Sequence, residues 1–259
     1  MLDAKIPSWL DESVEIKTPD QPTYFSVLSP QKKACGFILL SLKSLIEIDS
    51  KENFGLSLLQ MLDVIGNSIV ETGWGLKWRG WNFGGWKIHK DFVESYKKAN
   101  GVCPPWWRAA GHIGAKDDPV VYYRGFSSPV EFYKEWLLKF VPKNANKANR
   151  YYKTGQAFWS GGSWFHELCV SGYKGEVTKG NPDPSVKTHE NVLSRAKTML
   201  AQHILNLTPD GIWGNKSKNA CEKFQSDNQL SATGILDDAT IVKLIKSWIA
   251  NGLPINMNS

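Results

Sequence analysis

The chain of 259 residues carries 31 Lys and Arg against 25 Asp and Glu, a formal charge of +6, and 42% of its residues are hydrophobic. This composition supports one large or two small folded domains and excludes a disordered chain, a collagen-like repeat and a long coiled coil. No apolar run is long enough to span a bilayer, so we expect no stable membrane insertion. No basic run is dense enough to indicate nucleic-acid binding. The start of the chain, Met1–Lys5, lacks the pattern of a secretory signal.

Helical patterns dominate the first part of the chain. Residues 1–28 are polar and contain several prolines, which indicates an irregular arm. Ser29-Pro30 is typical of a helix start and predicts a helix that ends near residue 48. A second helix is predicted from Asn53, because apolar residues recur at helical spacing until the glycines that begin at Gly73.

The periodicity then disappears, and Gly, Trp, Asn and Pro dominate as far as Pro119. We expect loops here and one small β-hairpin, with its turn at Ala115–Pro119 and its returning strand at Val120–Phe126. Ser128-Pro129-Val130-Glu131 is a capping box and begins a helix that ends near Phe140. Shorter helices are predicted near residues 146–152 and 163–171.

A change of composition divides the chain near residue 180. Residues 176–189 are rich in turn residues and poor in apolar ones, which predicts a flexible linker. Residues 190–250 show three short helical patterns and form a module of about 60 residues, near the lower limit of independent folding. We therefore expect a mainly α (α+β) protein with a domain at 29–175, a separately folded helical module at 190–250 and a tail at 251–259.

Tryptophan and glycine are unusually abundant, with 12 and 22 residues. Nine of the tryptophans lie between Trp74 and Trp164. This density fits either an aromatic core or an open groove whose rings stack on sugar rings.

One carboxylate ends the second predicted helix, in the segment Glu71-Thr72-Gly73-Trp74-Gly75. A carboxyl group in apolar, aromatic surroundings is disfavoured as an anion. It is then suited to protonate a glycosidic oxygen as a general acid. The alternative is an ordinary surface glutamate, since a helix C-terminus does not stabilise a carboxylate.

Four motifs in order strengthen the first interpretation: Glu71–Gly75, Asn82–Lys87, Tyr123–Ser128 and Ser171–Tyr173. They resemble the Glu-Ser-Gly-Trp-Gly, Asn-Leu-Phe-Gly-(Ile/Val)-Lys, Phe-Arg-x-Tyr-x-Ser and Ala-Gly-Tyr motifs of the glucosaminidase family of peptidoglycan hydrolases (glycoside hydrolase family 73). The resemblance covers about residues 30–175 and implies a lysozyme-like fold. It also implies that Glu71 is the general acid. Substrate contacts are then expected from Trp74, Trp81, Asn82, Phe83, Trp86 and Tyr123.

The second catalytic group does not carry over from the family. Many members have an acidic residue on the hairpin, but residues 106–114 contain none here. Asp117 and Asp118 in the turn are the first candidates, followed by Glu94 and Asp91. An inverting route needs a base carboxylate roughly 6.5–9.5 Å from the acid, whereas a substrate-assisted route uses the sugar's N-acetyl group. Both routes stay open, and Tyr173 either orients that acetamido group or is a core residue.

The helical module has motifs of its own. Asp210-Gly211-Ile212-Trp213-Gly214 precedes a helix that contains Phe224-Gln225, and Thr233–Asp237 leads into the last helix. This pattern resembles the three-helix peptidoglycan-binding domain. Most of these residues are expected to be folding devices, and we place ligand binding in the groove near Trp213.

Together these features predict a cell-wall hydrolase that cuts the GlcNAc-β-1,4-MurNAc bond of bacterial peptidoglycan, its expected partner. A muramidase or lytic transglycosylase, a non-catalytic wall-binding protein and a chitinase-like enzyme are the alternatives. We expect a monomer without cofactor or metal, since no Cys/His ligand spacing occurs. Cys103 and Cys169 either pair or are buried thiols. Without a visible signal, the protein is expected to be made in the cytoplasm and delivered by a holin, a virion or a secretion apparatus.

Overall fold

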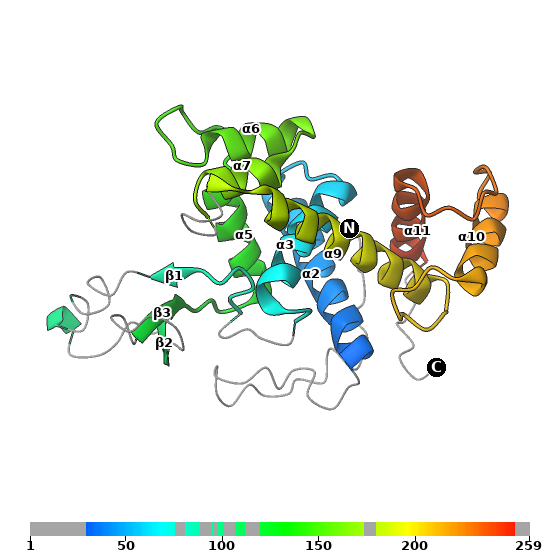
Figure 1. Cartoon of the computed structure of the whole chain (residues 1–259), viewed down its shortest axis with the longest axis horizontal. Coiled ribbons are helices and arrows are strands. Elements are labelled where there is room, and N and C mark those ends of the chain that lie inside the picture. Colours follow the sequence, from blue (N-terminus) through cyan, green and yellow to red (C-terminus); the bar gives the residue numbers. More distant parts are fainter. Residues whose placement is uncertain are drawn as a thin grey trace.

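The computed structural model describes residues 30–75, 81–88, 95, 98–100, 107–111, 120–173 and 180–251. Within these residues the chain is mostly helical, with a small sheet at one end (Figure 1). The helices are α2 (Pro30–Glu52), α3 (Leu58–Thr72), α5 (Pro129–Phe140), α6 (Tyr152–Ser160), α7 (Trp164–Val170), α9 (Asp183–Ile204), α10 (Asn215–Asp227) and α11 (Asp238–Ala250). The mainly α class predicted from the sequence is confirmed. None of the described helices is both long and apolar enough to cross a membrane.

The sheet contains β1 (Lys87–Ile88), β2 (Trp107–Gly111) and β3 (Val120–Arg124). Strand β3 lies in the middle and pairs antiparallel with both others. The predicted returning strand is therefore confirmed, whereas its turn lies outside the described residues. Strand β1 was not expected from the sequence, and it connects the Asn82–Lys87 motif to the hairpin.

Helix α3 begins at a cap that differs from the predicted one. Ser57 accepts a hydrogen bond from the backbone of Gln60 (3.2 Å), and the Gln60 side chain accepts one from the backbone of Ser57 (2.8 Å). This reciprocal pair is a capping box. The predicted start at Asn53 is wrong, because that residue has φ 52° and follows the end of α2. Gly73, with φ 56°, ends α3 as predicted.

A cluster of aromatic rings holds the first helices together. Phe83 is fully buried and meets Phe37 of α2 edge-on at 4.9 Å and Phe132 of α5 at 5.4 Å, measured between ring centroids. Edge-to-face packing of this kind adds to the free energy of apolar burial. The segment after α3 is thereby fixed against the helical core.

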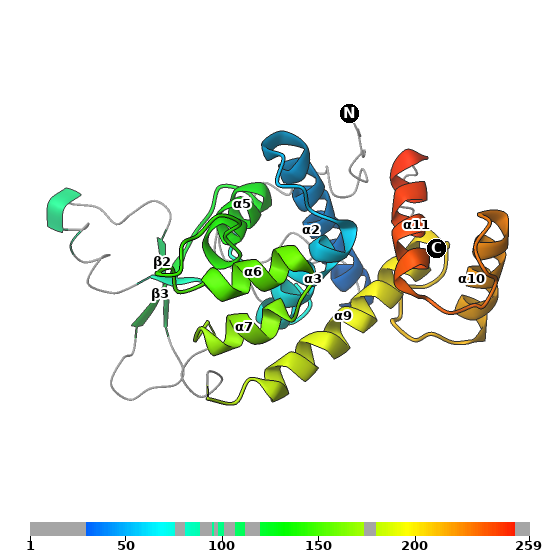
Figure 2. The same ribbon diagram turned by 90° about the horizontal axis from the view of Figure 1, so that it is seen from above.

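Helix α9 begins inside the predicted linker, so residues 183–189 are helical rather than flexible. Figure 2 shows α9 running along α7 and α3 to the pair α10–α11. Gly66 permits the close approach of α3, because an added Cβ would lie 3.0 Å from His189 Nε2. The His189 ring stacks on Phe165 of α7 at 4.1 Å, and its Nε2 lies 3.0 Å from the Asp63 carbonyl oxygen.

The helical module does not have a core separate from the rest. Ala196, Met199 and Leu200 of α9 and Leu244 of α11 belong to the same buried cluster as the apolar residues of α2 and α3. Separate folding of the module thus stays a prediction, and the shared core argues against it. The polar composition near residue 180 predicted a linker, whereas α9 contacts the core there, partly through His189 against Gly66 of α3.

Asp63 lies under α9, and its titration provides a test of this docking. Burial raises the pKa of Asp63 to about 6, and the charge of Lys197 and a hydrogen bond from Trp164 offset only part of this rise. Because the folded-state pKa exceeds the unfolded value, the folded state gains stability from the proton at low pH. This contribution is fully present below about pH 4 and is lost as the pH rises through about 6.

We therefore expect Asp63→Asn, which resembles the protonated form, to raise the free energy of unfolding above pH 6 by up to about 3 kcal/mol. It should also flatten the stability profile between pH 4 and 6. Denaturant unfolding at several pH values measures both effects. Asp227→Asn, in an exposed ion pair on α10, is the control and should leave the profile unchanged. A less stable Asp63→Asn protein at pH 8 would contradict the docking.

Candidate functional site

Glu71 lies in the last turn of α3 and is half-buried. Its carboxylate faces Gly85, where an added Cβ would lie 3.1 Å from Glu71 Oε2. Gly85 has φ 59°, a conformation that glycine adopts at little cost. The glycine therefore leaves room beside the carboxylate that any other residue would fill.

Asn82 fixes the backbone that carries Gly85. Its Nδ2 donates to the carbonyl oxygens of Trp86 and Arg124, both at 2.9 Å, and its Oδ1 accepts from the Trp86 backbone at 2.9 Å. Both ends of this amide are thus used inside the protein. The predicted substrate contacts from Asn82 and Phe83 stay predictions, but the structure favours a supporting role, because both side chains are buried inside the protein.

Tyr173 is bonded to the same loop. Its hydroxyl donates to the Gly84 carbonyl oxygen (2.8 Å) and accepts from Asn67 Nδ2 and Trp136 Nε1, both at 3.4 Å. Burial raises the pKa of Tyr173 above its ordinary value, and the negative charge of Glu71 raises it further. The hydroxyl thus stays protonated and donates its hydrogen bond to the Gly84 carbonyl oxygen. The structure therefore favours Tyr173 as a core residue over a contact with the acetamido group.

Asn67 is a site residue that the sequence analysis missed. It is buried one helical turn before Glu71, so both residues lie on the same side of α3. The spacing of four residues between Asn67 and Glu71, which puts both polar side chains on one side of α3, was a usable signal.

Two tryptophans that follow Glu71 in the chain have a strained backbone conformation. Trp74 has φ 64° and Trp81 has φ 56°, and both are half-buried. Bulky residues rarely adopt positive φ, and such strain concentrates at functional sites. These two rings keep their predicted role as candidate sugar contacts.

The ring of Trp86 is already in contact with positive charges. Lys139 Nζ lies 3.9 Å and the Arg124 guanidinium 4.9 Å from the ring centroid, and Arg124 also donates to Glu135 (2.6 Å). Desolvation lowers the pKa of Lys139, with a smaller contribution from Arg124. A ligand that reaches Trp86 would therefore meet the charges of Lys139 and Arg124 rather than a bare aromatic face.

Several predicted positions lie outside the described residues. These are Asp117, Asp118, Glu94, Asp91 and Cys103, together with the side chain of Tyr123. Cys169 is buried in α7. The second catalytic group and the Cys103–Cys169 pairing thus stay predictions. Among the described residues, no group of His, Cys, Asp or Glu is arranged to hold a metal ion.

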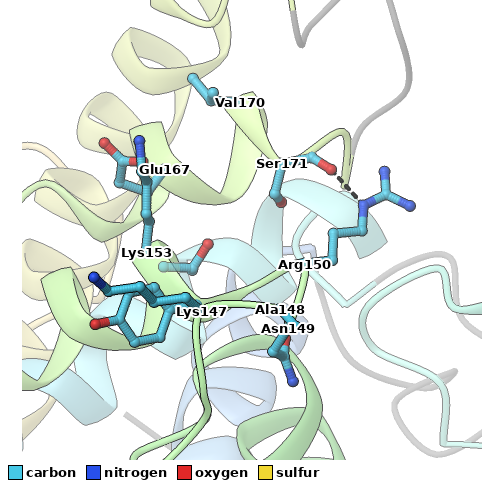
Figure 3. Close-up of a pocket in the computed structure, with 10 residues that line it drawn as sticks. Lys147, Ala148, Asn149, Arg150, Lys153, Glu167, Val170 and Ser171 are labelled. Carbon is cyan, nitrogen blue, oxygen red and sulfur yellow. Dashed lines mark hydrogen bonds between the residues drawn. The ribbon is translucent and has the colours of Figure 1, made fainter.

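A surface cavity of about 480 Å³ lies beside the Ser171–Tyr173 turn (Figure 3). Its lining includes Lys147, Arg150, Lys153 and Glu167. Arg150 Nε donates to the Ser171 carbonyl oxygen at 2.5 Å, which fixes the turn that precedes Tyr173. Glu71 is not among the lining residues, so the cavity is a neighbour of the candidate site and not part of it.

In the C-terminal module, Trp213 lies in the turn between α9 and α10. It is half-buried, and its Nε1 donates to the Gly234 carbonyl oxygen in the turn between α10 and α11 (2.9 Å). The indole therefore joins the two turns. Only the part of its ring that stays exposed is available to a ligand, so its predicted role in binding stays a prediction.

Comparison with protein families matches residues 182–244 to a putative peptidoglycan binding domain. The chain contains a peptidoglycan-binding domain. The match begins one residue before α9, so the helix that docks on α3 belongs to this domain. Comparison with curated proteins and with solved structures gives no match.

The peptidoglycan-binding domain reaches the candidate site through Arg195 of α9. The Arg195 guanidinium lies over the Trp74 ring, 5.2 Å from its centroid. Trp74 follows Glu71 by three residues. A cation on an aromatic face contributes about 0.5–1 kcal/mol at an exposed site, so this contact helps to fix the domain beside Glu71.

Proposed function

We propose that this protein hydrolyses the β-1,4 glycan backbone of peptidoglycan, with Glu71 as the general acid. The peptidoglycan-binding domain supplies the partner. One observation chiefly supports this function: the Glu71 carboxylate faces a space that Gly85 leaves open. The four sequence motifs that resemble the glucosaminidase family support the same activity.

In this mechanism the Glu71 carboxyl group protonates the glycosidic oxygen as the bond to the anomeric carbon breaks. Asn82 and Tyr173 hold the Gly84–Gly85 backbone in place and so preserve the space beside the acid. In the inverting route water attacks the anomeric carbon as a base carboxylate such as Asp117 or Asp118 takes its proton. In the substrate-assisted route the acetamido oxygen of the sugar first bonds to the anomeric carbon, and water then breaks this bond while Glu71 takes back a proton.

The proposed bond is the N-acetylglucosaminidase-type linkage, and cleavage of the other linkage by a muramidase or lytic transglycosylase is the alternative. Mass spectrometry of muropeptides, with and without borohydride reduction, distinguishes them. A new reducing GlcNAc supports the proposal, a new reducing MurNAc indicates a muramidase, and an anhydro product indicates a transglycosylase.

A non-catalytic wall-binding protein is the second candidate, because the family match covers the binding domain and not residues 30–175. Incubation of the full chain with purified sacculi decides between the two functions. Soluble muropeptides released over time support the hydrolase. Binding without any release would reject the hydrolase and leave the wall-binding function.

A substitution at Gly85 tests directly whether the space beside Glu71 is needed for activity. We expect Gly85→Ala to lower sacculus hydrolysis by about tenfold or more, because the new methyl group crowds Glu71 Oε2 and a small misplacement of a catalytic group is costly. Gly161→Ala is the matched control, since Gly161 has φ 76° but nothing within 4 Å of an added Cβ. Both variants share the backbone strain, so equal losses of activity would contradict the role of the space at Gly85.

A further inference from the structure

Two turns of the peptidoglycan-binding domain have the same pattern of hydrogen bonds. In the first turn, Gln202 Oε1 accepts from the Gly211 backbone at 2.9 Å. Its Nε2 donates to the Ile212 carbonyl oxygen at 2.9 Å and to Ser217 Oγ at 3.1 Å. Gln202 is almost fully buried, so it holds the backbone of this turn to α9.

The second turn repeats each of these bonds 23 residues later. Gln225 Oε1 accepts from the Gly234 backbone at 2.9 Å, and its Nε2 donates to the Ile235 carbonyl oxygen and to Thr240 Oγ1, both at 3.0 Å. Gln225 is also buried. The two turns are therefore equivalent in structure, although their sequences share little beyond Gly-Ile.

Each turn presents an isoleucine to solvent at the same position. Ile212 is 69% exposed and Ile235 is 63% exposed. Among the described residues, only Leu138 and Val170 are further large hydrophobic side chains that are classed as exposed. A single exposed apolar side chain needs no explanation, but the same exposure at two equivalent, rigidly held turns indicates a binding surface.

Each turn also lies against a basic side chain from the preceding helix. An added Cβ at Gly211 would lie 2.8 Å from Arg195 Cγ and Nε, and Gly234 has Lys218 at the equivalent position, again 23 residues later. An aliphatic side chain beside a cation fits a ligand that alternates sugar faces with carboxylates. Peptidoglycan has this chemistry, and the domain match already names it as the partner.

The two turns and the candidate active site are connected by direct contacts. The Trp213 indole donates to Gly234 and so joins the first turn to the second (2.9 Å). Arg195 contacts both Gly211 of the first turn and the ring of Trp74. A row of contacts thus leads from Gly234 of the second turn through the first turn to Trp74, three residues after Glu71.

We propose that Ile212 and Ile235 are two equivalent contact points for one peptidoglycan strand, and that Arg195 leads the strand from the first turn to Trp74. The two contact points depend on the wall-binding role alone, whereas the continuation to Trp74 rests on the proposed hydrolase function. The tests below separate these parts.

The first test measures binding of the full chain to purified sacculi by co-sedimentation, with Glu71→Gln in every sample so that digestion does not interfere. Ile212→Ser and Ile235→Ser should each weaken binding about fivefold, and the double variant about 25-fold, since each loses part of the apolar contact of one side chain. Leu138→Ser, a 55% exposed leucine on α5, is the control and should bind as the parent does. Circular dichroism checks that the fold is retained.

A double variant that binds within twofold of the parent would overturn the two-point site. This readout does not require catalysis, so it stands even if the protein proves not to be a hydrolase. A loss from only one of the two single variants would reject the equivalence of the turns.

The second test concerns the continuation to Trp74. Arg195→Met keeps an unbranched side chain against Gly211 but removes the cation above Trp74. We expect hydrolysis of intact sacculi to fall about fivefold and hydrolysis of short soluble glycan oligomers to fall by clearly less, because only a long strand reaches from the first turn to Trp74. Equal effects on both substrates, or no effect, would overturn the continuation, whereas absence of hydrolysis by the unmodified chain would instead reject the proposed function.

Discussion

Replacing Glu71 with glutamine is expected to abolish lysis of purified sacculi while leaving the protein folded. The amide is nearly isosteric with the carboxyl group but cannot donate a catalytic proton. Loss of general acid catalysis should lower the rate by about 10²- to 10⁴-fold. Release of soluble muropeptides over time measures the rate, and thermal unfolding checks the fold.

The matched control for this variant is Glu190→Gln, on the exposed surface of α9. It makes the same chemical change away from Gly85 and should keep its activity. A folded Glu71→Gln protein that retains more than a tenth of the unmodified rate would reject Glu71 as the acid. Loss of activity in both variants would indicate an effect of charge on wall binding instead.

The end of α3 was predictable from the sequence because its causes are local. Apolar residues at helical spacing and the glycine at Gly73 define the helix end, and the carboxylate of Glu71 follows from its position there. The capping box of Ser57 and Gln60 was equally local and was available in the sequence. A capping residue at Asn53 competed with it, and only the hydrogen bonds decide between the two.

The roles of individual motif residues were less predictable, because they depend on which way each side chain points. Phe83 and Trp81 are close in sequence and both aromatic, yet Phe83 is fully buried and Trp81 is half-exposed. The same holds for Trp213, whose direction the sequence does not indicate. Its indole donates a hydrogen bond to Gly234 of another turn, whereas the neighbouring Ile212 faces solvent.

The docking of α9 was the hardest feature to predict, because it depends on complementarity between distant segments. Gly66 is separated from His189 by more than 120 residues, and neither residue type signals a contact. The polar surface of the first turns of α9 looks like a linker when only composition is considered. The structure shows that a polar helix can be buried along one narrow face.

This docking predicts that a fragment ending at Pro184 will not keep the stability of the full chain. The fragment lacks nearly all of α9 and so loses the four residues that α9 buries in the common core, Ala196, Met199, Leu200 and Ala201, together with three from α11. For Met199 and Leu200 alone, at about 1.5–3 kcal/mol each, the loss is about 3–6 kcal/mol. Folded proteins of this kind have a total stability of about 5–15 kcal/mol, so the fragment is expected to be largely unfolded or aggregated.

A fragment ending at Leu207 is the matched comparison, because it retains α9 but lacks both Ile-bearing turns. It should be more stable than the shorter fragment by several kcal/mol in denaturant unfolding, cleave soluble glycan oligomers and bind sacculi weakly. The full chain should unfold in one cooperative transition that includes the peptidoglycan-binding domain. A fragment ending at Pro184 that melts within a few degrees of the full chain and cleaves soluble oligomers would show that residues 30–175 fold without α9, and would contradict the shared core.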